Sequence, residues 1–186
     1  MNSAEVRKSR RNLILLFSIF IIPVVLAKLA LENDWFEKAA TNSGELLQQE
    51  MSISELDFQN KALEKKWLII FRLPSPCDDN CKQTIYGINQ TFISLGREMD
   101  RVIPVGLYSP EVNTDELGVL KEKFWKFDLM SAASRDRLKS NEIYVSDPLG
   151  NVILKYPTPK TDEEVLSVGK AMLSDLRKLL KYSRVG

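Results

Sequence analysis

The stretch WLIIFRLPSPCDDNCKQTIYGINQTF, residues 67–92, decides how this chain folds. It opens with an apolar run over residues 67–73 that only Arg72 interrupts, which is typical of a strand buried on both faces of a sheet. Two prolines follow, and then Cys77 and Cys81 in a Cys-x3-Cys spacing. Residues 81–99 place apolar side chains at every third or fourth position, so they predict a helix.

Further along the chain, strand and helix patterns alternate. We expect strands at residues 102–108, 143–146 and 152–156, and helices at residues 113–126 and from the capping box Thr161-x-x-Glu164 onward. Between the last two strands lies Asp147-Pro148-Leu149-Gly150-Asn151, a segment of residues that favour a turn. In the order β-α-β-α-β-β-α, a right-handed crossover makes the first two strands parallel, whereas the final hairpin is antiparallel. The fold class is therefore α/β: a thioredoxin-like, three-layer α/β/α domain with a mixed sheet.

The N-terminus predicts a single transmembrane helix before this domain. Residues 13–31, LILLFSIFIIPVVLAKLAL, are apolar except for three positions. At 1.5 Å per residue they reach about 28 Å, close to the roughly 30 Å hydrocarbon thickness of a bilayer. Four basic residues precede this segment and three acidic residues follow it closely. This charge asymmetry predicts a cytoplasmic N-terminus and a domain on the other side of the membrane.

Two alternatives for this segment stay open, a cleaved signal peptide and a buried core helix. The sequence around Ala27-Lys28-Leu29-Ala30 lacks the small-residue spacing of a cleavage site, which favours an uncleaved anchor. The length and the flanking charges disfavour a core helix. We therefore expect a basic cytoplasmic N-terminus at residues 1–12, an anchor at 13–31, a linker or extension at 32–62 and the thioredoxin-like domain at 63–186.

Composition excludes several classes of function. The formal net charge is +1, so nothing points to nucleic acid as a partner. The chain has no histidine, which excludes histidine-based triads, histidine-bound zinc and haem with a proximal histidine. Cys77 and Cys81 are the two cysteines of the sequence, so any thiol or soft-metal chemistry runs through their loop.

The cysteine pair is the candidate catalytic site. Backbone N–H groups at a helix N-terminus stabilise an anion, so a thiol placed there is readily ionised. Cys77 and Cys81 can close a disulfide if Cys77 lies just outside the helix, and outside the cytoplasm such a pair can be oxidised. The alternative is a static disulfide that pins the loop. A ring this small gains little loop entropy, which favours thiol–disulfide exchange over a purely stabilising role.

Asp78 and Asp79, between the two cysteines, are candidate modulating residues. Their negative charges oppose thiolate formation, but they would favour a bound cation. Two thiolates suit Cu(I), a soft ion, so Cys77 and Cys81 are also candidate metal ligands. Two cysteines usually leave a third ligand to be supplied, and Met130 is a thioether candidate although its apolar neighbours favour a role in the core.

These features together resemble the Sco/SenC family of membrane-anchored, thioredoxin-like proteins. The resemblance rests on the strand, the proline-rich loop with Cys77 and Cys81, the helix, and the segment Ile143-Tyr144-Val145-Ser146-Asp147-Pro148-Leu149-Gly150. It implies a role in cytochrome c oxidase assembly, by delivering copper or by reducing the cysteines of the oxidase copper site. The implied partners are a cytochrome c oxidase subunit or its assembly factors. The implied location is a bacterial-type inner membrane, with one span and a periplasmic domain.

The chain departs from this family at the third copper ligand. The family supplies a histidine a few residues before the position of Tyr144, and here Lys139 stands at that place. A protonated lysine has no lone pair for a metal, but it would favour a nearby thiolate. Lys139 is therefore a third candidate modulating residue, the alternative being a solvated surface charge. Three functions remain: a thiol–disulfide oxidoreductase, a Cu(I)-binding assembly factor, and a non-catalytic membrane-tethered binding module.

Overall fold

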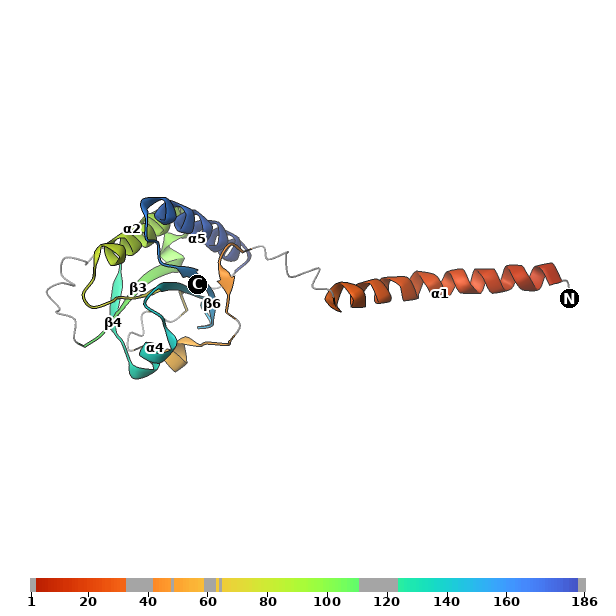
Figure 1. Ribbon diagram of the computed structural model, residues 1–186, viewed down its shortest axis with the longest axis horizontal. Coiled ribbons are helices and arrows are strands. Elements are labelled where there is room, and N and C mark those ends of the chain that lie inside the picture. Colours follow the sequence, from red (N-terminus) through yellow and green to blue (C-terminus); the bar gives the residue numbers. More distant parts are fainter. Residues whose placement is uncertain are drawn as a thin grey trace. The chain divides into compact units, whose positions relative to one another are not determined.

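A computed structural model describes residues 3–32, 42–47, 49–58, 63, 65–110 and 124–183. The chain divides into two compact units, Met1–Thr41 and Asn42–Gly186. The first contains helix α1 (Ser3–Glu32), drawn in red in Figure 1. Its Arg10–Ala30 segment is long and apolar enough to cross a membrane, which makes it a candidate span.

The side chains of α1 have the composition of a candidate membrane span. The first unit leaves large apolar residues such as Ile19 and Phe20 exposed, at 68% and 70%. The Ser18 hydroxyl donates to the Ile14 carbonyl at 2.8 Å, so the helix itself satisfies this polar group. Pro23 lies inside the helix, as helix-breaking residues are tolerated in membrane spans.

The second unit is built on one six-stranded mixed sheet with the order β1-β6-β5-β2-β3-β4. Strands β2, β3 and β4 are parallel to one another, whereas β5, β6 and β1 are joined by antiparallel pairings, with β5 antiparallel to β2. The strands are β1 (Glu45–Leu46), β2 (Trp67–Arg72), β3 (Val102–Tyr108), β4 (Lys126–Leu129), β5 (Glu142–Ser146) and β6 (Val152–Pro157). The mixed sheet predicted from the sequence is confirmed.

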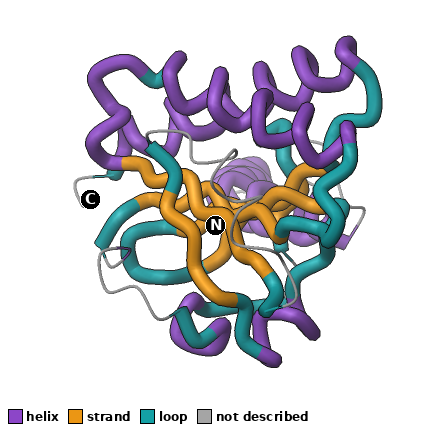
Figure 2. The backbone as a smooth tube through the Cα atoms, turned by 90° about the vertical axis from the view of Figure 1, so that its left-hand side faces the viewer, coloured by secondary structure: helices purple, strands orange, loops and turns teal. Residues whose placement is uncertain are grey.

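Helices cover both faces of this sheet, which gives the expected three layers (Figures 1 and 2). On one face lie α2 (Asp79–Ser94) and α5 (Asp162–Tyr182), and on the other lie the shorter η2 (Ile53–Leu56) and α4 (Ala132–Arg137). The 3-10 helix η4 (Gly96–Arg101) links α2 to β3. Alternate residues of β2 point into the two layers: Ile69 and Phe71 pack under α2 and α5, and Leu68 and Ile70 pack toward η2 and α4.

Two strands lie where the sequence predicted other structure. Residues 45 and 46, within the stretch read as linker, form β1 on the edge of β6. Lys126, the last residue of the helix expected over residues 113–126, instead begins β4 and pairs with β3. Residues 124 and 125 are not helical either, and residues 113–123 of that expected helix lie outside the described residues.

A buried carboxylate holds the start of the second unit in place. Asp175 of α5 is fully buried and its Oδ2 accepts hydrogen bonds from the amides of Ser43 and Gly44, at 2.7 and 2.8 Å. The Tyr156 hydroxyl donates to the same oxygen at 3.0 Å. Burial and the adjacent carboxylate raise the pKa of the Tyr156 phenol. Residues 43–46, which we call the strap, are thereby tied to α5 and β6.

Candidate redox site at Cys77 and Cys81

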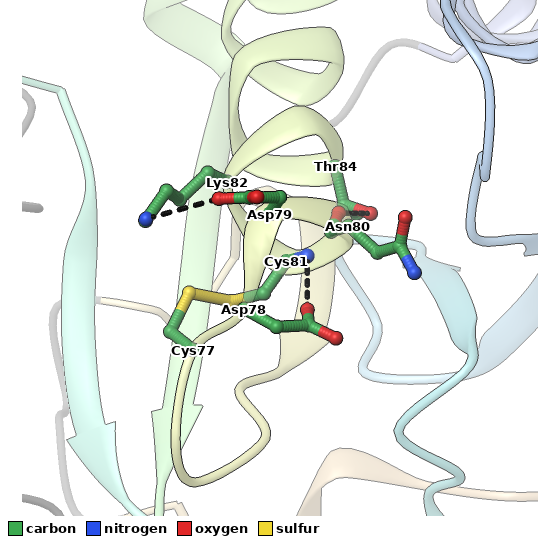
Figure 3. Close-up of a disulfide and its surroundings, with 7 residues drawn as sticks. All are labelled: Cys77, Asp78, Asp79, Asn80, Cys81, Lys82 and Thr84. Carbon is green, nitrogen blue, oxygen red and sulfur yellow. Dashed lines mark hydrogen bonds and ion pairs between the residues drawn. A yellow bond between two sulfur atoms is a disulfide. The ribbon is translucent and has the colours of Figure 1, made fainter.

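The two cysteines lie where β2 gives way to α2, and they form a disulfide with 5.3 Å between their Cα atoms (Figure 3). The sequence predicted this helix from Cys81, but α2 begins at Asp79. Cys77 therefore precedes the helix, and Cys81 is in its first turn. Such a position lets the loop backbone adjust until the two sulfurs meet, as expected for a Cys-x3-Cys pair.

Asp78 is the reason that the helix begins early. Its backbone is extended and its side chain accepts a hydrogen bond from the Cys81 amide at 2.9 Å, which is the N-cap arrangement. Asp78 is exposed, so its carboxylate stays hydrated while it satisfies one of the free amides of the first turn. Asp79 is 96% exposed and pairs with Lys82 at 3.2 Å. Both aspartates thus lie beside the disulfide (Figure 3).

The two cysteines differ sharply in accessibility. Cys81 is 1% exposed and belongs to the core cluster beneath α2, together with Ile85 and Phe71. Cys77 is only partly buried and packs at the border of that cluster. A partner's sulfur can therefore approach Cys77, whereas Cys81 can be reached only from within the protein.

Lys139 lies in the connection between α4 and β5, at the same end of the sheet as the cysteine loop. This follows from the antiparallel register, which pairs Phe71 near the end of β2 with Ile143 near the start of β5. The Lys139 ammonium forms an ion pair with Glu142 at 3.6 Å and is 68% exposed. Its proximity to a sulfur stays a prediction.

Glu142 is the centre of a charged cluster that the sequence did not reveal. It accepts a hydrogen bond from the Tyr144 hydroxyl at 2.5 Å and pairs with Lys155 at 3.5 Å as well as with Lys139. Burial opposes ionisation of this carboxyl, but the Tyr144 hydrogen bond and the two lysine charges outweigh it and lower the pKa of Glu142. Burial, followed by the hydrogen bond to Glu142, raises the pKa of the Tyr144 phenol.

Arg72 is a second residue that the sequence pattern left without a role. Its guanidinium donates to the carbonyl oxygens of Arg135 and Leu138, at 3.0 and 2.8 Å. These bonds fix the end of α4 beside the end of β2, five positions before Cys77. In the sequence, the one signal for this positioning role of Arg72 was a charge at the end of an apolar strand.

The donor set fits copper only in part. Cys77 and Cys81 supply two soft sulfur ligands within one helical turn, but the chain has no histidine for a third. Met130 is buried in the cluster on the η2 and α4 side of the sheet, opposite the cysteines. Within the described residues, no group of three or more Cys, His, Asp or Glu side chains is placed to hold a metal ion.

Comparisons with known proteins agree with this fold. The model of a family described as transmembrane-like, thioredoxin-like, C-terminal domain matches residues 67–183. No curated protein sequence matches the chain. The apo Sco1 protein of Thermus thermophilus has 15% sequence identity and a TM-score of 0.51, over 75% of this chain and 97% of that one.

Two further solved structures have lower TM-scores. The copper-bound ScoI of Arabidopsis thaliana has 14% identity and a TM-score of 0.47, over 63% of this chain and 88% of that one. A SCO1/SenC family lipoprotein of Bacillus anthracis has 16% identity and a TM-score of 0.47, over 64% and 84%. The expected resemblance to Sco/SenC proteins is confirmed at the level of the fold by the Thermus thermophilus protein.

Proposed function

The chain belongs to the family of transmembrane-like, thioredoxin-like C-terminal domains, and from this premise we propose that it is a membrane-anchored thiol–disulfide exchange protein of the cell envelope. Its partners are cysteines that must be reduced or oxidised during the assembly of cytochrome c oxidase. One observation carries the proposal: a disulfide at a helix N-terminus, with Cys77 partly exposed and Cys81 buried.

This asymmetry assigns a role to each cysteine. In the reduced protein, the Cys77 thiolate attacks one sulfur of a partner disulfide, which forms a mixed disulfide and releases one partner thiolate. Cys81 then loses its proton and attacks the sulfur of Cys77, which restores the Cys77–Cys81 bond and releases the second partner thiolate. Two electrons pass to the partner, whose two thiolates each take up a proton. The reverse sequence oxidises a partner dithiol.

Groups near Cys77 affect how much of it is thiolate, and the first step depends on this thiolate. The free amides and the dipole at the start of α2, a helix of 16 residues, favour a thiolate at Cys77. Asp78 and Asp79 act against this effect because their charges repel a thiolate. We propose that these aspartates, together with Lys139 from the neighbouring connection, set the balance between thiol and thiolate.

The proposed location follows from the anchor. Basic residues before α1 and acidic residues after it support a cytoplasmic N-terminus, and a disulfide supports a periplasmic domain on the other side of a bacterial-type inner membrane. The division proposed from the sequence is a basic N-terminus at 1–12, an anchor at 13–31, an extension at 32–62 and the redox domain at 63–186. The part of the extension from residue 42 onward belongs to the same compact unit as the redox domain.

Trapping of the mixed disulfide tests the proposal. The full chain, reduced and held in lipid nanodiscs, is mixed with a peptide that contains a Cys-x3-Cys disulfide. Cys81→Ser should accumulate a covalent adduct through Cys77, whereas Cys77→Ser should form none. Equal adducts from the two variants, or none from either, would refute the proposal.

A second function, Cu(I) binding, is favoured by the two sulfurs within one turn. It predicts one Cu(I) per reduced chain in a competition with a chelator of known affinity, and loss of binding in either single serine variant. A non-catalytic binding module would instead require that the double serine variant still supports oxidase assembly in cells.

A further inference from the structure

Helices α2 and α5 lie side by side and run in the same direction, away from the disulfide. Gln83 near the start of α2 donates to Asp162 at the start of α5, at 3.3 Å, and Arg177 late in α5 donates to the Ser94 carbonyl at the end of α2. The two helices approach closely between these points. A Cβ on Gly87 would lie 3.2 Å from the Val165 side chain, and one on Gly169 would lie 3.3 Å from Thr91.

This pairing leaves a groove of about 700 Å³ along the outer surface of the two helices. Gly87 and Gly169 line the groove where the two helices approach each other, and large apolar side chains line it on each side. Tyr86 from α2 is 60% exposed and Leu166 from α5 is 59% exposed, so both present apolar surface that the domain itself does not cover. Val165 and Leu173 extend the apolar lining along α5.

The groove begins next to the proposed redox site. Lys82, which lines it, directly follows Cys81, and Asp162 lines the same end. From there the lining continues along α2 as far as Ser94. This end of the groove is therefore the one at which a polypeptide bonded to Cys77 would enter it.

The charges at the rim select the chemistry of the occupant. Lys82 and Lys170 are both exposed at the groove. The lining has one carboxylate, Asp162, against these two lysines, so its net charge is positive, and the pair between Lys82 and Asp79 is exposed and therefore weak. An occupant that combines apolar side chains with carboxylates complements such a groove, whereas a basic segment does not.

We propose that the groove between α2 and α5 binds the partner segment that flanks the partner's reactive cysteine, and that this segment is apolar and acidic. The inference rests on the proposed exchange function and adds a substrate class to it. Apolar side chains of the partner pack between Tyr86 and Leu166, and its carboxylates lie against Lys82 and Lys170. The groove thereby favours one class of protein disulfide over small disulfides of equal reactivity.

Exchange rates with defined peptides test this inference. The probe is a single-cysteine peptide with leucines and glutamates at helical spacing, whose cysteine carries a coloured thionitrobenzoate leaving group. Attack by reduced Cys77 on the peptide sulfur releases that group as a thiolate that is followed by absorbance. The full chain in nanodiscs should react about tenfold faster with this peptide than with a serine- and lysine-based peptide, an advantage of about 1.4 kcal/mol.

Substitutions in the groove should remove this preference. Leu166→Glu and Tyr86→Glu should bring the rates for both peptides together, and Lys170→Glu should slow the acidic peptide and speed the basic one. Leu149→Glu is the matched control, because Leu149 is 78% exposed in the turn between β5 and β6, at the opposite end of the sheet. Circular dichroism verifies the fold of each variant.

The reaction of reduced Cys77 with a small aromatic disulfide tests the exchange function separately from peptide binding in the groove. If Cys77 fails to react even with this reagent, the exchange function is wrong and the groove loses its role with it. If the reagent reacts but the peptide preference survives Leu166→Glu, the groove inference alone is overturned. A dimer that light scattering detects and Leu166→Glu dissociates would also overturn it, because a second copy of the chain would then cover the groove.

Discussion

The Asp78 carboxylate and the Cys81 amide are joined by a hydrogen bond of 2.9 Å, inside the ring that the disulfide closes. One residue therefore caps the helix and places a negative charge beside Cys77, the sulfur that we propose as the nucleophile. The cap supports the geometry of the oxidised pair, and the charge opposes the thiolate of the reduced pair. These two effects can be separated by substitution.

Loss of the cap should destabilise the domain. Asp78→Ala removes the acceptor of the Cys81 amide and should lower the free energy of unfolding by about 0.5–2 kcal/mol. Asp78→Asn keeps an acceptor and should lie close to the wild type. Urea unfolding followed by tryptophan fluorescence measures this, and Asp79→Ala, at a 96% exposed position, is the control. Equal losses at both positions would contradict the role of the cap.

Removal of charge should speed the reaction of Cys77. Asp78→Asn and Asp79→Asn each delete a negative charge near the sulfur, so a larger fraction of the reduced protein should be thiolate at neutral pH. The rate of iodoacetamide alkylation in the Cys81→Ser background should rise in both variants. Unchanged rates across the neutral pH range would show that the aspartates do not modulate the site.

Alkylation of the reduced wild type should be strongly selective. Cys77 is partly exposed and Cys81 is 1% exposed, so a short pulse of reagent should modify Cys77 first. Peptide mass spectrometry assigns the modified residue. In denaturant the two cysteines should react at similar rates, and selectivity that persists there would mean that burial is not its cause.

Acid should weaken the cluster around Glu142. The folded pKa of this carboxyl lies below its ordinary value of 4.5, so the unfolded chain binds more protons in the range between the two values. Its contribution to stability is complete above the unfolded value and is lost as the pH falls through the folded value. Glu142→Gln should therefore lose less stability than the wild type between pH 7 and acid, as measured by urea midpoints.

A second glutamate, outside the Glu142 cluster, serves as the control for this acid experiment. Glu50→Gln changes an exposed carboxylate and should preserve the acid sensitivity of the wild type. If Glu142→Gln and Glu50→Gln followed the same curve, the lysine and tyrosine contacts of Glu142 would contribute no measurable stability.

Loss of the α5 carboxylate that holds the strap should destabilise the domain. Asp175→Ala leaves the buried Gly44 amide and the more exposed Ser43 amide without their acceptor, and an unsatisfied buried group is worth about 1–3 kcal/mol. Tyr156→Phe removes only one donor and should cost less. Limited proteolysis should cut the strap faster in Asp175→Ala. Ser174→Ala, at an exposed position of the same helix, should leave cleavage unchanged.

Local patterns were enough to predict the central elements. The apolar run of β2, the three-and-four spacing of α2 and the capping box of α5 each predict one element, and the structure contains all three. The capping differs in one detail, since the Glu164 side chain accepts from the Lys160 amide while the Thr161 hydroxyl accepts from the Glu164 amide. The start of α2 was predicted two residues late, at Cys81 instead of Asp79, and the signal for the true start is Asp78, a residue type that is common at N-caps.

Long-range contacts explain what the sequence pattern could not reveal. Strand β1 has two residues and exists because β6, more than 100 positions away, offers its edge. β4 exists because β3 offers a parallel edge to Lys126 and Phe127. The ion pairs of Glu142 join β5 to β6 and to the loop before β5, and only the folded sheet brings them together. A sequence pattern over a few neighbouring residues does not indicate such long-range pairings.

The strap also has a mechanical consequence. Its amides are bonded to a carboxylate in the middle of α5, and Glu45 and Leu46 pair side by side with β6. A tension applied to the backbone at residue 42 would therefore act first on these hydrogen bonds, before it reaches the central strands of the sheet. The strap is thus the part of the domain that would resist such a tension first.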